Sequence, residues 1–298
     1  MLFPTSTPRI FKAERPSFTA ELVNNYRAIA TLLSMCDDPF AIQFADWDAA
    51  IYIYLFVGLR YVFGKRISDG MICVLAIRTN FMDDFIREAE SAQVVILGAG
   101  LDARAYRLKG LGGDEVHFFE VDAPSTQRMK KAKVKEVFQR RPDLFQSGAY
   151  QKGHVTYVTC NFASNESFFD RLCEEGFNPK NPKTVILLEG VASYLTWEEL
   201  KSTLLKVAQC APGTRFVMNV PVGNRIKTSS FAKFLKHVVG EEWKFAMQDT
   251  DTSESLFGPL GFKILRELTF NQAMDQLPIL NGERKLPHAG KMIFMEVK

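Results

Sequence analysis

The sequence predicts an α/β fold in which a doubly wound parallel sheet ends in an antiparallel hairpin. From residue 94 onward, short apolar or β-branched runs alternate with amphipathic segments, a pattern typical of parallel βαβ units. Before residue 90 the apolar residues recur at helical spacing instead. The last two apolar runs, 263–269 and 291–297, are joined by a loop rich in proline and glycine without a convincing crossover helix, which favours a hairpin.

Residues 1–90 are expected to form a helical N-terminal layer. The helical spacing is carried by two sets of apolar residues, Leu22, Tyr26, Ile29, Ala30 and Leu33, then Ile72, Leu75, Ala76 and Phe81. The first residues contain Pro4, Pro8 and Pro16 and no apolar core of a secretory signal, so an irregular arm is predicted there.

Residues 91–298 are expected to form the catalytic domain, with no glycine- or serine-rich linker inside it. Five strands are predicted at 94–100, 117–122, 156–162, 184–191 and 215–222, and the hairpin brings the sheet to seven. The helices between them are predicted at 102–108, 124–139, 166–175 and 197–210. An amphipathic insertion at about 223–257 is expected to act as a lid, with its apolar side formed by Phe231, Phe234, Leu235, Val238 and Trp243.

Composition excludes several classes of function. With 37 Lys and Arg against 34 Asp and Glu, the chain lacks the charge footprint of a nucleic-acid binder. The longest apolar stretch, Ala49 to Val57, is too short for a membrane span, which needs about 20 residues. The five cysteines are scattered and do not combine with the four histidines at metal-ligand spacing, so reduced core thiols and no metal site are predicted. A soluble cytoplasmic protein is expected.

A glycine turn follows the first predicted strand. Val94 to Leu97 run into Gly98 and Gly100, where missing side chains let a nucleotide-like ligand lie against the backbone. With Ala103 the turn also satisfies the loose GxGxxA pattern, so a dinucleotide-binding oxidoreductase is a competing reading. Asp102, at the start of the next helix, would repel a pyrophosphate, whereas S-adenosylmethionine carries no phosphate. The turn therefore favours that cofactor, with a helix N-cap as the purely structural role of Asp102.

Polar residues follow three further strands at the same edge of the sheet. Asp122 ends the second strand, where a carboxylate can bind both ribose hydroxyls, although a solvated strand end is the structural alternative. Asn161 and Phe162 end the third strand. Asn161 can accept a hydrogen bond from the exocyclic amine of adenine, and Phe162 can stack on the ring; the structural alternative is a turn asparagine beside a core phenylalanine. Glu189 follows four apolar residues of a central strand, and because buried carboxylates are rare it is the strongest candidate for a ligand contact.

Three segments together resemble the leucine carboxyl methyltransferase family, including its bacterial small-molecule O-methyltransferases. GAGLDARAYRL, FFEVDAP and LLEGVASYLT occur in the family's order and spacing. In the N-terminal layer, YRAIATLLSMCDDPFA and LAIRTNFMDD are similar to its basic segments, so the resemblance covers roughly residues 25 to 200. It implies a class I, Rossmann-like methyltransferase fold and S-adenosyl-L-methionine as cofactor.

Carried over to this chain, the family pattern assigns individual roles. It implies that Arg27 and Arg78 bind the cofactor carboxylate, since a guanidinium suits a bidentate contact. Gly98 and Gly100 would line the cofactor, Asp122 its ribose, Asn161 and Phe162 its adenine, and Glu189 its methionine side. The family usually has Asp-Leu where this chain has Asn-Phe, so the adenine contact is neutral here. Tyr194 matches a tyrosine near the acceptor and is the expected catalytic residue; packing at a helix start is its alternative.

The expected reaction is O-methylation of a small acidic or phenolic molecule. A carboxylate is favoured, because it is ionised at pH 7 and needs no general base, and none of the four histidines is placed to serve as one. A protein C-terminal carboxyl methyltransferase, a nicotinamide-dependent oxidoreductase and an inactive cofactor-binding protein are the alternatives.

Overall fold

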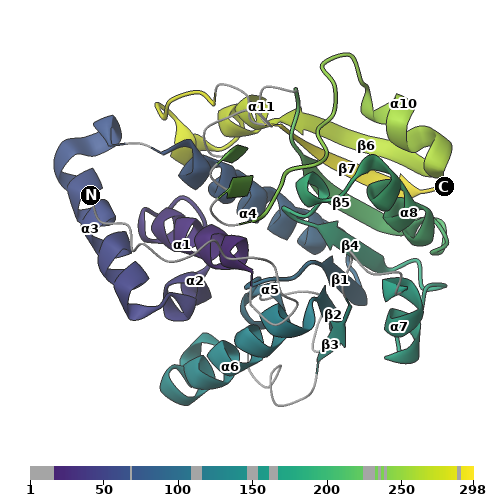
Figure 1. Cartoon of the computed structure of the whole chain (residues 1–298), viewed down its shortest axis with the longest axis horizontal. Coiled ribbons are helices and arrows are strands. Elements are labelled where there is room, and N and C mark those ends of the chain that lie inside the picture. The colour runs from purple at the N-terminus through teal and green to yellow at the C-terminus, as the bar shows by residue number, and fades with distance from the viewer. Residues whose placement is uncertain are drawn as a thin grey trace.

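The computed structural model describes residues 17–67, 69–108, 116–145, 154–160, 167–223, 232–233, 236–237, 240–286 and 290–298. It contains the predicted seven-stranded sheet, in the order β3-β2-β1-β4-β5-β7-β6 (Figure 1). The strands are β1 (Gln93–Leu97), β2 (His117–Asp122), β3 (Val155–Thr159), β4 (Thr184–Leu188), β5 (Arg215–Val220), β6 (Phe262–Thr269) and β7 (Lys291–Val297). β1 to β5 are parallel, and β7 is antiparallel to both β5 and β6, which confirms the predicted hairpin.

The direction in which the chain crosses the sheet changes between β1 and β4. From β1 the chain moves outward through β2 and β3, then returns to the other side of β1 to form β4 and β5. β1 is therefore hydrogen-bonded to β2 on one side and to β4 on the other. In open α/β sheets, ligands bind beyond the carboxyl ends of the strands at such a switch point.

Helices cover the sheet on both faces. Four precede the first strand: α1 (Phe18–Leu32), α2 (Pro39–Phe44), α3 (Trp47–Phe63) and α4 (Gly70–Glu88). The later ones are α5 (Arg104–Arg107), α6 (Pro124–Arg140), α7 (Phe168–Glu174), α8 (Trp197–Val207), α10 (Ser253–Phe257) and α11 (Phe270–Asp275). Short 3-10 turns are η1 (Gly64–Arg66), η2 (Pro142–Leu144), η3 (Ala192–Tyr194), η6 (Gly258–Leu260) and η7 (Pro278–Leu280).

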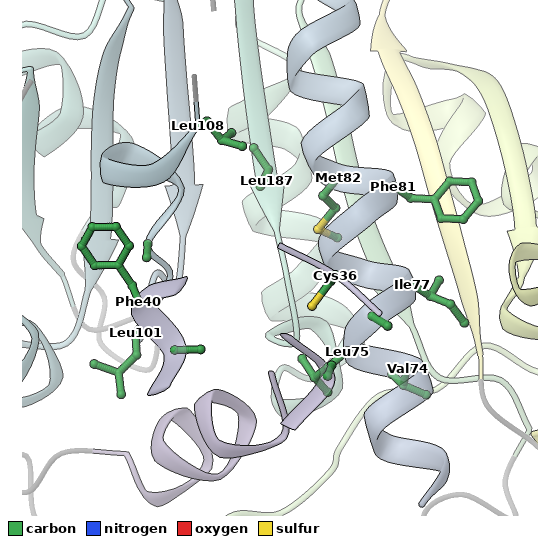
Figure 2. Close-up of a cluster of buried hydrophobic side chains, with 14 of the residues drawn as sticks. Cys36, Phe40, Val74, Leu75, Ile77, Phe81, Met82, Leu101, Leu108 and Leu187 are labelled. Atoms are coloured by element: carbon green, nitrogen blue, oxygen red, sulfur yellow. The ribbon is translucent and has the colours of Figure 1, made fainter. Parts of the chain in front are cut away.

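The alternating side chains of the central strands build two cores. Val94 and Ile96 of β1 belong to one apolar cluster, which includes residues of α1, α2, α4 and α6. Val95 and Leu97 belong to a second cluster, which includes residues of α7 and α8. Figure 2 shows part of the first cluster, in which Leu75, Ile77 and Met82 project from α4 and Leu187 from β4. Successive residues of a strand point to opposite faces, so a continuous apolar run can feed both cores.

Several element boundaries differ from the sequence predictions. The predicted strands 94–100 and 184–191 end at Leu97 and Leu188, because Gly98 and Gly190 adopt left-handed φ angles of 72° that turn the chain. The predicted helix 102–108 shrinks to the single turn of α5. The loop between β6 and β7 contains a helix that was not predicted, α11, whose Thr269 and Gln272 form a capping box.

The cysteine prediction is correct for four residues and wrong for one. Cys36, Cys73, Cys160 and Cys210 are buried and free, whereas Cys173 lies exposed on α7. Groups of three or more potential metal ligands do not occur among the described residues. Within the same part of the chain, no helix combines the length and the apolar character needed to cross a membrane.

Candidate active site

A cavity of about 300 Å³ lies at the switch point of the sheet, beyond the carboxyl ends of β1, β2 and β4. Seven of the nine site residues expected from the sequence line it: Arg27, Arg78, Gly98, Gly100, Asp122, Glu189 and Tyr194. Asn161 and Phe162 fall outside the described residues, although Cys160 just before them lines the cavity. The fold thus brings expected site residues from five separate segments of the chain to one cavity.

The floor of the cavity is the glycine turn after β1. Gly98 and Gly100 have left-handed φ angles of 72° and 50°, which glycine adopts without strain. A Cβ on Gly98 would lie 2.3 Å from Cγ2 of Val191, so no side chain fits there. The amides of Gly98 and Ala99 donate to the carbonyl of Val121, at 2.8 and 3.1 Å, and tie the turn to β2.

The same glycine turn holds the carboxylate of Asp122 in place. Its Oδ2 accepts from the amide of Gly100 at 2.5 Å, and its Oδ1 accepts from the amide of Ala123 at 2.6 Å. Burial raises the pKa of Asp122, and these two amides oppose that shift. Because a carboxylate has about four acceptor positions, Asp122 can still accept two further hydrogen bonds. A pair of neighbouring hydroxyl groups is a suitable partner.

Glu189 lines the cavity and forms ion pairs with three arginines. Its Oε1 accepts from Arg27 at 2.8 Å and from Nε of Arg78 at 3.1 Å, with Nη2 of Arg78 at an ion-pair distance of 2.9 Å, and its Oε2 accepts from Arg104 at 2.6 Å. Burial alone would raise the pKa of Glu189, but the charges of Arg104, Arg27 and Arg78 outweigh it and hold that pKa well below its usual range. Glu189 is therefore ionised at any physiological pH.

Backbone turns fix the two arginines that face the cavity. Arg78 Nη2 lies where a Cβ on Gly190 would come within 2.7 Å, so the glycine makes room for the guanidinium. The amide of Gly190 donates to Asn219 at 2.8 Å, which anchors this turn to β5. Arg27 lies on α1 and Arg78 on α4, and both are buried. The N-terminal helices therefore place two guanidinium groups at the carboxyl edge of the sheet.

A second layer of buried charges stands behind Glu189. Arg104 also contacts Asp102 and, at 2.7 Å, Asp83. Arg107 donates to Asp83 at 2.6 Å and lies 3.5 Å from Asp38. Together four arginines and four carboxylates balance in this part of the protein. They are Arg27, Arg78, Arg104, Arg107, Asp38, Asp83, Asp102 and Glu189.

Arg104 was missed at the level of sequence, where it looked like an ordinary helical residue. The available signal was the alternation of Asp102, Arg104 and Arg107 directly after a glycine turn. The N-cap residue of α5 is Ala103, so the N-cap prediction for Asp102 is wrong by one position. The Oδ1 of Asp102 still accepts from the amide of Arg104 at 2.8 Å, and Asp102 combines this contact with its ion pair and lines the cavity.

The cavity is also lined by Tyr194 and by a carboxylate that the sequence did not reveal. Glu241 is 5% exposed, lines the cavity, and accepts from Ser17 Oγ at 3.2 Å and the amide of Thr19 at 3.4 Å. Burial raises the pKa of Glu241, and burial together with the charge of Glu241 raises the pKa of Tyr194. Tyr194 also precedes α8, whose capping box at Thr196 confirms the predicted helix start. The wall thus offers a neutral phenol and a carboxyl group with raised proton affinity.

Comparison with known proteins identifies the family. The leucine carboxyl methyltransferase family model matches residues 20–208. A protein of Mycobacterium tuberculosis named "Putative S-adenosyl-L-methionine-dependent methyltransferase" is 31% identical over 224 residues, which cover 72% of this chain and 67% of that protein. A Bacillus subtilis protein of the same description is 34% identical over 148 residues, covering 49% of this chain and 44% of that one.

The fold comparison agrees with the sequence comparison. The crystal structure of a methyltransferase from Thermobifida fusca YX, described as putative, aligns over 96% of both chains with a TM-score of 0.57 and 14% identity, which shows a shared fold. Since the family model spans well over half of the residues and the Mycobacterium relative aligns across both proteins, this chain belongs to the leucine carboxyl methyltransferase family.

Proposed function

We propose that the protein transfers the methyl group of S-adenosyl-L-methionine to an oxygen of a small acidic molecule, and that this oxygen belongs to a carboxylate. The observation that carries the proposal is the set of charged groups on one cavity: Arg27 and Arg78, the ionised Glu189 between them, and the clamped carboxylate of Asp122.

These residues fit the cofactor group by group. Arg27 and Arg78 suit its α-carboxylate and Glu189 its ammonium, because each contact pairs opposite charges in a site shielded from water. Asp122 suits the two ribose hydroxyls, and the absent side chain of Gly98 lets the ligand lie against the backbone. Asn161 and Phe162 remain proposed adenine contacts. When bound, the cofactor supplies a methyl group on a positively charged sulfur.

The chain's own residues then align the acceptor. A carboxylate acceptor is ionised at pH 7, so the protein needs to hold it in line and exclude water rather than remove a proton. Tyr194 stays neutral because its pKa is raised, and its hydroxyl can donate to the acceptor oxygen and orient it. We propose that the layer 1–90 encloses that acceptor against the domain 91–298. Four apolar residues of the lid expected at about 223–257, Phe231, Phe234, Leu235 and Val238, lie outside the described residues, so the lid stays a prediction.

Glu241 supports a phenolic acceptor as a second candidate. A phenol must lose its proton to become a nucleophile, and a carboxylate on the cavity wall with a raised pKa is a suitable general base. A carboxylate acceptor would instead favour the protonated form of Glu241. Methylation of a protein C-terminus is a further alternative, while the family assignment argues against the oxidoreductase. The five free cysteines support a reducing compartment, in keeping with the proposed cytoplasmic location.

Calorimetric titration tests the cofactor proposal. S-adenosylhomocysteine should bind the wild type, and the oxidised nicotinamide dinucleotide should not. Asp122→Asn should weaken S-adenosylhomocysteine binding about tenfold or more, as expected for loss of a charged hydrogen-bond acceptor. The control Asp143→Asn changes an exposed carboxylate and should bind normally. Binding of the dinucleotide alone would refute the proposal.

The acceptor is tested by the release of S-adenosylhomocysteine from panels of aromatic carboxylates, phenols and a leucine-terminated peptide. Glu241→Gln separates the two small-molecule candidates. With a phenol it should lower kcat about a hundredfold or more and remove the acidic limb of the pH profile. With a carboxylate it should preserve the rate, because the glutamine amide is neutral like the protonated form of Glu241 that such an acceptor favours. Turnover of the peptide alone would transfer the proposal to protein methylation.

A further inference from the structure

Helix α3 presents an unusual apolar surface to the outside. Twelve large hydrophobic residues are exposed in the described part of the chain, and nine of them lie on α3: Trp47, Ile51, Tyr52, Tyr54, Leu55, Leu59, Tyr61, Val62 and Phe63. The inner face of the helix is buried through Ile53, Val57 and Arg60. Figure 1 shows α3 at the edge of the molecule, with α1 and α2 between it and the sheet. A contiguous exposed apolar patch of this kind marks an interaction surface.

The exposed face has the spacing of a helix-packing stripe. Ile51, Leu55, Gly58 and Val62 are separated by four, three and four residues and therefore lie along one line of the helix. Gly58 is exposed, and a Cβ added to it would meet nothing within 4 Å. The protomer itself thus gives no reason for a residue that weakens helices. A glycine at this place allows the backbone of another helix to approach closely.

The charges and sizes along α3 complement the same helix running in the opposite direction. If Leu55 lies opposite Gly58 of a second copy, then Ile51 lies opposite Val62, and Asp48 comes near Lys65 in η1, directly after the end of α3. Within the protomer, Lys65 also donates to the carbonyl of Asn281 and lies 3.9 Å from Glu283. Two-fold symmetry makes each contact twice. A large side chain then meets a glycine, and an acidic helix start meets a basic helix end. We propose that two copies of this chain form a homodimer through antiparallel packing of their α3 helices.

The exposed aromatic residues of α3 supply a large part of the area that a dimer contact needs. Trp47, Tyr52, Tyr54, Tyr61 and Phe63 are 78%, 57%, 57%, 72% and 54% exposed. Aromatic side chains of this size bury about 150–250 Å² each, so these five present on the order of 500 Å² before the aliphatic residues are added. A standard interface buries about 800 Å² on each partner. A lipid surface fits less well, because the stretch from Ile51 to Phe63 exposes no lysine or arginine and two aspartates begin the helix.

Sedimentation velocity of the full chain over a concentration series tests the dimer. The wild type should show a monomer–dimer equilibrium, and Leu55→Asp should raise the dimer dissociation constant more than about tenfold, because a charge is buried without a partner. Leu205→Asp, at an exposed leucine of α8, is the matched control and should leave the equilibrium unchanged. Gly58→Ala should also weaken the dimer, although a methyl group there raises the helix propensity of the monomer.

Exchange of charges tests the antiparallel register. Asp48→Lys should weaken the dimer, because two lysines then meet, and adding Lys65→Asp should restore it. Thermal melts of each variant verify folding. A wild type that stays monomeric at every concentration would overturn the proposal. So would co-sedimentation with phosphatidylglycerol vesicles that Leu55→Asp abolishes, since it would assign α3 to a membrane surface. Failure of the double variant to recover would reject this register.

Discussion

Replacement of Glu189 by glutamine is the sharpest test of the charged centre. The amide keeps the size of the side chain but removes the charge that Arg27, Arg78 and Arg104 share at 2.6 to 2.9 Å. All four groups are buried, so three guanidinium groups lose their common counter-ion without gaining water. Removing one partner of a buried ion pair costs about 3–5 kcal/mol, and we expect a loss of that size in the free energy of unfolding.

The loss should not depend on pH in the neutral range. The folded-state pKa of Glu189 is depressed, so its contribution is fully present above the unfolded-state pKa of about 4.3 and disappears only as the pH falls through the much lower folded value. Urea unfolding of wild type and Glu189→Gln at several pH values between about 5 and 8 should therefore give parallel stabilities.

The cofactor assay makes the same variant informative about function. The glutamine amide cannot pair with an ammonium group as a carboxylate does, so binding of S-adenosylhomocysteine should weaken by about tenfold or more. Glu198→Gln, an exposed glutamate in the first turn of α8, is the matched control and should stay within about 0.5 kcal/mol of wild type. A stability loss below about 1 kcal/mol for Glu189→Gln would refute the claim that the three arginines depend on this carboxylate.

Three further perturbations address other parts of the fold. Gly98→Ala should lower the free energy of unfolding by about 1–3 kcal/mol and weaken S-adenosylhomocysteine binding, because it strains a left-handed backbone and places a Cβ against Val191. In urea unfolding, adding Val191→Ala should recover only the part of the loss that is due to the steric clash. Burial raises the pKa of Glu120 from 4.5 to about 7, although Lys130 lies 2.5 Å away. The free energy of unfolding of the wild type should therefore fall by up to about 3 kcal/mol relative to that of Glu120→Gln as the pH rises from about 4.5 to 7. A difference between the two proteins that does not change with pH would contradict this. Cys173, the one exposed thiol, should react with a disulfide reagent before the four buried thiols, although burial and the charges of Asp170 and Glu174 raise its pKa and slow the reaction; Cys173→Ser should abolish that first phase.

The sheet could be predicted because its strands carry a strong local signal. Buried parallel strands are continuous apolar runs, and the runs at β1 and β4 feed both cores. Their ends could not be predicted, since Val191 extends the apolar pattern beyond Leu188 while Gly190 turns the backbone away. The direction of a glycine turn depends on tertiary contacts, and apolar pattern does not encode it.

The site could be predicted only where chemistry and position coincide. Glu189 was found because a charge at the end of an apolar strand has few structural explanations. Arg27 and Arg78 were assigned through the family resemblance alone, because an arginine in a helix is usually solvated. Glu241 belongs to a segment without periodicity, so only the folded chain brings it to the cavity wall. In α3 the apolar run was noticed, but its outward orientation depends on what the neighbouring helices leave uncovered.

The buried charges are better understood as a device for orientation than as a source of stability. A buried ion pair seldom stabilises a fold more than apolar residues of similar volume would, because each charge must leave water. Here Asp83 and Asp102 hold Arg104, Arg104 holds Glu189, and Glu189 holds the arginines that face the cavity. Arg104 follows the glycine turn by only a few residues, so one short stretch of chain both lines the cavity and fixes the position of Glu189. The amino-acid end of the proposed cofactor, with one carboxylate and one ammonium, leaves the net charge of this balanced cluster at zero, so neither of those two groups would be left without a partner.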